Sequence, residues 1–182
     1  MVDAHTGDHY ELTNKECTFG YRDSIFKHHP RWVIVSAELD LQPHTGTAEE
    51  LTATIRATTK ERVSEQSIGE RTAGSTFKGV PNDAEMVALI RSHKRIWNKP
   101  PYTSWLYENR RGFISAGFLI EMAGLKGRRV GDVMVSPKHA NFIINCGDGT
   151  AEQVVMLVGI IKEHIHRKFG VQLEEEIQYV GF

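Results

Sequence analysis

The segment Gly74-Ser75-Thr76-Phe77-Lys78-Gly79 contains the residue types needed to bind an anion. A hydroxyl between glycines and beside a lysine can offer backbone N–H groups, a side-chain donor and a positive charge to a phosphate or carboxylate. The segment is not a P-loop, because it lacks that motif's spacer and its Gly-Lys-Ser/Thr ending. The alternative interpretation is an ordinary turn rich in glycine and serine.

A second candidate for anion binding is Arg22, within Tyr21-Arg22-Asp23-Ser24. An arginine presented from a polar stretch can hold a carboxylate or a phosphate bidentately. The alternative is a surface ion pair between Arg22 and Asp23. The acidic run 174–176 is, by composition alone, typical of a solvated turn.

The nine histidines do not form a recognisable metal site. His164 and His166 are two positions apart on a predicted helix, so they point to different faces. His28 and His29 are adjacent and diverge for the same kind of reason. None of the usual zinc-ligand spacings occurs, and we therefore expect no metal site.

The charge balance argues against a dedicated nucleic-acid-binding protein. Lysine and arginine total 22 and aspartate and glutamate 23, which gives a net charge of −1. The basic segments 91–99 and 162–168 interleave with apolar residues, as solvated helix faces do. No apolar run approaches the roughly 18 residues of a membrane span. We therefore expect neither a nucleic-acid nor a membrane partner. The two cysteines fit a reducing compartment, so we expect a cytoplasmic protein.

Hydrophobic periodicity and turn residues predict an α+β fold, in which helices pack on a small sheet. The clearest element is a last helix that begins after Thr150, carries apolar residues at helical spacing and ends at Gly170. A run of β-branched and alternating apolar residues predicts a strand over Trp32–Leu41. The remaining helices are predicted over 47–65, 83–99 and 115–123. Strands are predicted over 130–135 and 142–146, over 177–182 together with Leu173, and as short segments within 1–30. A hairpin turn is predicted at 3–7 and an irregular loop with a short extended core at 66–82.

Five stretches, taken in order, carry a resemblance to a known family. They are FGYRDSIFK (19–27), AGSTFK (73–78), SAGFLIE (115–121) with AGLKG (123–127), VSPKHANFIIN (135–145), and FGV (169–171) with residues 173–181. Together they resemble the UDP-N-acetylenolpyruvoylglucosamine reductases of peptidoglycan synthesis. The resemblance implies a flavoprotein in which NADPH reduces FAD and the flavin passes hydride to the enolpyruvyl group of UDP-N-acetylglucosamine enolpyruvate.

The resemblance also implies roles for individual residues. Ser75 matches the family's proton donor, Arg22 its arginine beside the substrate carboxylate, and Glu176 its C-terminal glutamate, which would stabilise or orient the enol form. Substrate-binding residues implied in the same way are Lys126 at the UDP phosphates and His139 near the nucleotide sugar, with Lys60 and Arg62 as further basic candidates. Tyr21, Arg22 and Gly74 would lie against the flavin.

The sequence departs from the family pattern at three places. The Gly-rich flavin-binding region of the family would precede residue 1, Gly79-Val80 replaces the family's Asn-Pro, and the segment 80–111 is longer than the compact fold needs. We therefore expect residues 1–45 to be the strand-rich end of an FAD-binding domain and residues 46–182 a substrate-binding domain. On this interpretation, a separate flavin-binding region is a partner, the chain alone does not bind FAD tightly, and an apolar edge is exposed. The alternative is a stand-alone UDP-sugar-binding domain without redox activity.

Overall fold

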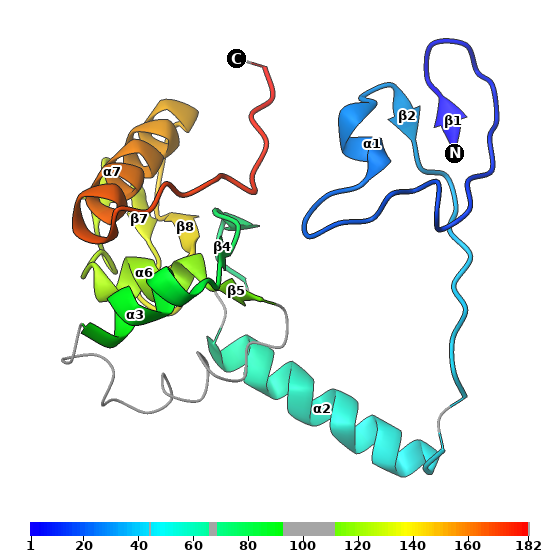
Figure 1. The fold of residues 1–182 in the computed structure, drawn as a ribbon, viewed down its shortest axis with the longest axis horizontal. Helices are drawn as coiled ribbons and strands as arrows, with labels where there is room; N and C mark the ends of the chain where they lie inside the picture. The colour runs from blue at the N-terminus through cyan, green and yellow to red at the C-terminus, as the bar shows by residue number, and fades with distance from the viewer. Residues whose placement is uncertain (44, 66–68, 93–111, 182) are drawn as a thin grey trace. The chain divides into compact units, whose positions relative to one another are not determined.

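The computed structural model describes residues 1–43, 45–65, 69–92 and 112–181, and Figure 1 shows their ribbon. The chain divides into two compact units, Met1–Thr54 and Ile55–Phe182. The helix α2, Ala48–Glu65, contains the division between them. The helix predicted at 47–65 is confirmed. None of the described helices is both long and apolar enough to cross a membrane.

The first unit is built on a two-stranded antiparallel sheet. Strand β1 (Val2–Asp3) pairs with β2 (Trp32–Val33). The predicted turn at 3–7 is present, because the backbone N–H of Gly7 donates to the carbonyl of Asp3 at 2.8 Å. The buried Asp3 carboxylate accepts from the backbone N–H of His5 at 2.8 Å, and this hydrogen bond lowers the pKa of Asp3.

Two strand predictions in this unit are wrong in part. The strand predicted over Trp32–Leu41 ends at Val33, and its remaining large apolar residues are exposed. A strand is stable only where a neighbouring strand provides hydrogen-bond partners. Within the described part of the first unit, β1 pairs with two residues of this segment, Trp32 and Val33. Of the short strands predicted within 1–30, β1 is present, whereas Ile25–His28 form the short helix α1.

The second unit contains a four-stranded antiparallel sheet in the order β3-β8-β7-β6. Its strands are β3 (Thr72–Ser75), β6 (Arg129–Val130), β7 (Val133–Val135) and β8 (Phe142–Asn145). The single strand predicted over 130–135 is wrong, since Gly131 and Asp132 turn the chain into a β6–β7 hairpin. The strand predicted over 142–146 is confirmed apart from its last residue.

A second small sheet and a helix follow β3 in the chain. Strand β4 (Val80–Pro81) pairs with β5 (Phe113–Ile114), so the predicted loop 66–82 contains two short strands. Helix α3 covers Ala84–Ser92, and the backbone N–H of Met86 donates to the Asp83 carboxylate at 2.8 Å, as expected of a helix start. The part of the predicted helix beyond residue 92 lies outside the described residues.

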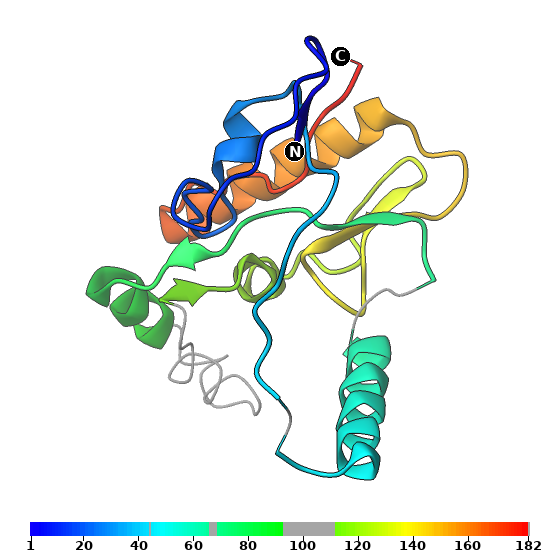
Figure 2. The same cartoon turned by 90° about the vertical axis from the view of Figure 1, so that its right-hand side faces the viewer.

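Helix α7, Ala151–Phe169, packs across β6 and β7, as Figure 2 shows. Thr150 caps it, with its hydroxyl accepting from the Gln153 backbone N–H and the Gln153 side chain accepting from the Thr150 backbone N–H. Gly170 ends the helix at φ +68°. The predicted apolar face is confirmed, because five of its side chains are buried: Leu157, Val158, Ile161, Ile165 and Phe169.

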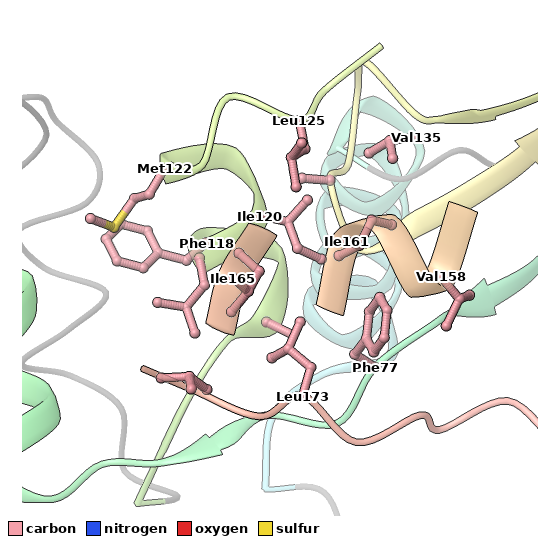
Figure 3. Packing of buried hydrophobic residues seen from close by; sticks show 14 of the residues in the cluster. Phe77, Phe118, Ile120, Met122, Leu125, Val135, Val158, Ile161, Ile165 and Leu173 are labelled. Carbon is pink, nitrogen blue, oxygen red and sulfur yellow. The ribbon is translucent and has the colours of Figure 1, made fainter. Parts of the chain in front are cut away.

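The core is centred on α6, Ala116–Met122, where Figure 3 shows the packing. Leu119 and Ile120 are completely buried, and a helix apolar on nearly every face must lie inside the molecule. Phe77 and Leu173 belong to the same buried cluster. The predicted fold class, α+β with helices packed on a small sheet, is confirmed.

The strand predicted over 177–182 is wrong for its described residues, 177–181, which have no ladder. The pairing instead occurs just upstream, as an isolated antiparallel bridge between Phe77 and Glu175. This bridge pairs the segment around Glu175 with the segment that follows β3.

Candidate functional site at one end of the sheet

The register of the four-stranded sheet brings several predicted site residues to one of its ends. Ser75, the last residue of β3, pairs with Phe142, the first of β8, and Val135, the last of β7, pairs with Ile143. The backbone N–H of Gly127 donates to the carbonyl of Val135 at 2.9 Å. Adjacent strands lie about 4.8 Å apart, so Ser75 and Gly127 are separated by about 14 Å across the sheet end. Four predicted site residues lie near this end or in its loops: Gly74, Ser75, Lys126 and His139.

Gly74 places Ser75 through a bulge in β3. Thr72 and Ser75, three residues apart, pair with residues two apart on β8, so β3 carries one extra residue. Gly74 has φ +87°, a conformation that an L side chain rarely adopts. Such bulges redirect neighbouring side chains. A Cβ at Gly74 would have no heavy atom within 4 Å, so the space beside this backbone is open. It adjoins a pocket of about 240 Å³, lined among others by Gly74, Thr76, Val133 and Ile177.

Glu176 lies next to Ser75 through backbone pairing. The backbone N–H of Glu176 donates to the carbonyl of Thr76 at 2.8 Å. The Phe77–Glu175 bridge continues this antiparallel pairing. The structure therefore brings the segments of Ser75 and Glu176 together, although they are far apart in the sequence.

The three consecutive glutamates have different surroundings. The Glu174 carboxylate pairs with Lys78 Nζ at 3.1 Å. Glu175 pairs with Lys162 Nζ at 2.9 Å, and both of these side chains are about three-quarters buried. Glu176 is half-buried. These contacts fix the segment against α7 and the β3 side, so the run is not a uniformly solvated turn.

Asn141 is a buried polar residue to which the sequence patterns assign no role. Its side-chain Oδ1 accepts from the backbone N–H of Phe77 at 3.0 Å, and its Nδ2 donates to the carbonyl of Phe77 at 2.9 Å. Its own carbonyl accepts from the backbone N–H of Thr76 at 2.8 Å. The signal available in the sequence is a polar residue directly before a buried strand.

His139 lies in a tight loop between β7 and β8. The buried Ser136 hydroxyl accepts from the backbone N–H of His139 at 3.4 Å, and His139 Nδ1 accepts from the backbone N–H of Asn141 at 3.2 Å. An accepting Nδ1 requires the neutral ring to carry its proton on Nε2. The ring lies edge-on to Phe142, with centroids 4.7 Å apart. A Cβ on Gly117 would come within 3.3 Å of this ring, so glycine allows α6 to approach the loop closely.

Lys126 lies in the loop that joins α6 to β6. Its Nζ is 2.8 Å from a carboxylate oxygen of Glu121, and about a third of each side chain is exposed. The Nζ of Lys126 is thus partly open to solvent, from which a ligand phosphate would approach it.

Lys60 and Arg62 belong to α2, which precedes β3. Lys60 is exposed. The side chain of Arg62 lies outside the described residues. Their assignment to a substrate-binding surface stays a prediction.

Arg22 and Tyr21 belong to the first unit, where a turn presents them. The backbone N–H of Gly20 donates to the carbonyl of Asp23 at 2.9 Å, and the N–H of Asp23 donates to the carbonyl of Gly20 at 3.3 Å. Arg22 lies at the tip of this turn with φ +56°. Its guanidinium carbon lies 5.8 Å from the centroid of the Tyr21 ring. A non-glycine residue in this conformation is strained, and such strain concentrates at functional sites. The convergence of Arg22 with Ser75 and Glu176 stays a prediction.

Asp23 is held beside this turn by His28. His28 Nε2 lies 3.0 Å from the Asp23 carboxylate, which also accepts from the backbone N–H of Ser24 at 2.9 Å. The hydrogen bond from His28, with that from Ser24, lowers the pKa of Asp23. Among the described residues, no group of three or more histidine, cysteine, aspartate or glutamate side chains could hold a metal ion.

Comparison with known proteins gives the class of protein. The chain is 36% identical over 168 residues to a UDP-N-acetylenolpyruvoylglucosamine reductase of Solibacter usitatus, which covers 91% of the chain and 49% of the relative. It is 32% identical to the Vibrio cholerae reductase, over 97% of the chain and 54% of the relative. The crystal structure of the Thermus caldophilus reductase matches 96% of the chain and 49% of its own length, with a TM-score of 0.62 and 28% identity. All three proteins are named as reductases of an enolpyruvyl UDP-sugar.

The model of the UDP-N-acetylenolpyruvoylglucosamine reductase C-terminal domain matches residues 65–180, which is more than half of the chain. The chain therefore belongs to this family, and the resemblance carried by its five motifs is confirmed. It spans about half the length of the curated relatives it matches.

Proposed function

We propose that this chain takes part in the NADPH- and FAD-dependent reduction of UDP-N-acetylglucosamine enolpyruvate to UDP-N-acetylmuramate, a step of peptidoglycan precursor synthesis. Family membership supports the reaction class. The observation that supports the proposal is the hydrogen bond from the backbone N–H of Glu176 to the carbonyl of Thr76, the residue after Ser75. Residues 1–45 would then close a flavin-binding domain, and residues 46–182 would bind the substrate.

The reaction requires a hydride at one carbon and a proton at the next. When bound, reduced FAD supplies the hydride to the β-carbon of the enolpyruvyl group. Negative charge then develops at the α-carbon and its carboxylate. Ser75 would donate the proton that completes the α-carbon, and since a hydroxyl is a weak acid, neighbouring groups must assist the transfer.

Two charged residues would act on the developing enolate. The Arg22 guanidinium would hold the substrate carboxylate bidentately, and its strained position at the turn tip supports a role in binding. Glu176, half-buried and fixed by its backbone, would orient or stabilise the enol form. Both roles depend on geometry set before the substrate arrives.

The nucleotide part of the substrate would lie toward the loops at the same sheet end. Lys126 would exchange its partner Glu121 for a phosphate of UDP. His139, with its proton on Nε2, would donate to a sugar or phosphate oxygen. Lys60 and Arg62 would extend the basic surface.

Several features of the chain fit a flavin. The open space beside Gly74 would admit a flat ring against the backbone. Tyr21 and Arg22 are both exposed and would meet the same cofactor. A separate flavin-binding region would supply the remaining contacts. The free cysteines, Cys17 and Cys146, fit a cytoplasmic location.

The first test is a calorimetric titration of the purified chain with UDP-N-acetylglucosamine enolpyruvate, together with its visible absorbance before and after FAD is added. Saturable binding of the UDP-sugar supports the proposal, and the absence of binding contradicts it. A bound-flavin spectrum would show a self-sufficient reductase. Colourless protein that binds the sugar would be the substrate-binding half.

The second test separates a reductase from a binding module. It uses a fusion in which this chain replaces the matching region of the Solibacter relative. Substrate-dependent NADPH oxidation by the fusion supports catalysis. A fusion that binds FAD and the UDP-sugar but oxidises no NADPH favours the binding module.

A further inference from the structure

We propose that Asn141 is a positioning residue, whose side-chain amide holds Ser75 and Glu176 in one arrangement. The proposal rests on the proposed function, which assigns catalytic roles to Ser75 and Glu176. Asn141 is almost completely buried at the start of β8. It would act through the backbone of Thr76 and Phe77 rather than by touching substrate.

The contacts of Asn141 extend the sheet by one residue. Its amide makes the same pair of hydrogen bonds to Phe77 that a backbone peptide would make, at 3.0 and 2.9 Å. Its carbonyl accepts from Thr76 at 2.8 Å. The segment after Ser75 is thus fixed on one side by a single residue.

The opposite side of the same segment holds Glu176. The carbonyl of Thr76 accepts from the backbone N–H of Glu176 at 2.8 Å. The backbone N–H of Lys78 donates to the backbone carbonyl of Glu174 at 2.9 Å. The segment 76–78 therefore lies between Asn141 and the C-terminal acidic run. Displacement of Phe77 would change the spacing of Ser75 and Glu176 together.

Loss of the amide would leave buried groups without partners. Phe77 as a whole is 1% exposed, so water cannot readily replace the bonds to its backbone. Asn141→Leu keeps the approximate volume but removes both bonds. We expect local opening of the segment rather than loss of the whole fold, because α7 and α6 supply most of the core.

The test is backbone amide hydrogen exchange of the chain. Asn141→Leu should accelerate exchange at Phe77 and Glu176 by about tenfold or more, while the amides of Leu157 in α7 change little. Asn145→Leu is the matched control, since Asn145 ends the same strand and bonds to Gly147 and Gly149. It should accelerate exchange in that turn alone. Unchanged exchange at Phe77 and Glu176 in Asn141→Leu would overturn the proposal.

Asn141→Asp keeps the proposal testable if the leucine variant does not fold. Its carboxylate can accept from the Phe77 N–H but repels the Phe77 carbonyl, whereas the protonated acid can donate to that carbonyl as the amide does. Protection factors at Glu176 should therefore rise in this variant as the pH is lowered. The wild type over the same pH range is the control. A variant that follows the wild type at every pH would contradict the role of the amide.

Kinetics in the Solibacter fusion link the contact to function. Asn141→Leu should lower kcat by about tenfold or more and leave the KM for the UDP-sugar within about threefold, whereas Asn145→Leu should leave both near wild type. An inactive wild-type fusion would contradict the proposed function, while the exchange experiment would still decide whether Asn141 holds the segment.

Discussion

The backbone N–H of Glu176 donates to the carbonyl of Thr76 at 2.8 Å, and this bond joins the chain end to the residue after Ser75. Backbone pairing of this kind is rigid compared with contacts between long side chains. The backbone segments that carry Ser75 and Glu176 are therefore joined without the help of a ligand.

The three glutamates of the C-terminal run should differ in their effect on catalysis. Glu176→Gln removes the charge proposed to act on the enol form, so we expect kcat of the Solibacter fusion to fall by about 100-fold. Glu174→Gln and Glu175→Gln disturb ion pairs with Lys78 and Lys162 and are the matched controls. If all three variants lose activity equally, the assignment of Glu176 fails.

Gly74→Ala should destabilise the protein. Its backbone has φ +87°, and a side chain in a left-handed conformation costs about 1–2 kcal/mol. The control is Gly159→Ala, in α7, where a Cβ also has open space and helix propensity should raise stability by about 0.5–1 kcal/mol. Urea denaturation measures both free energies of unfolding. A change of the same sign in the free energy of unfolding for both substitutions would refute the conformational explanation.

The ion pair beside Arg22 should be visible in a pH titration. The folded-state pKa of Asp23 is lowered by the hydrogen bond from His28, so the stability that it contributes is present at neutral pH and is lost as the pH falls through that pKa. In His28→Ala the pKa of Asp23 should rise toward its usual value. The control is His29→Ala, since His29 stacks on Trp32 instead. Side-chain NMR measures the titration, and an unmoved Asp23 pKa in His28→Ala would contradict the assignment.

Lys126→Met should weaken binding of the UDP-sugar. We expect about a tenfold rise in Kd at low salt, and a smaller dependence on salt than in the wild type, because a charge facing the phosphates is gone. Arg167→Met is the control, since Arg167 is exposed and pairs within α7 with Glu163. Calorimetric titration measures both, and equal losses would indicate a general effect of charge.

Apart from the four-residue helix α1, the described helices were predictable from the sequence because their signals are local. Thr150 and Gly170 mark the ends of α7, and its apolar spacing repeats with the helix period. The pairing of the strands was not predictable, because each strand depends on a partner that is distant in the sequence. Ile34 and Val35 have strong strand propensity but no ladder in the described part of the first unit.

The site was predictable in part, for the same physical reason. The motifs point to Ser75 and Glu176, and the register of the sheet shows that their segments are neighbours. The role of Asn141 depends on a contact with Phe77, which no local pattern contains. The bulge at Gly74 likewise becomes visible only from the pairing of β3 with β8.

The most direct test of the central claim is substrate-dependent NADPH oxidation by the Solibacter fusion carrying Ser75→Ala. The account predicts that FAD and the UDP-sugar still bind, while kcat falls by about 100-fold or more because the α-carbon receives no proton. Turnover equal to that of the wild-type fusion would contradict the account.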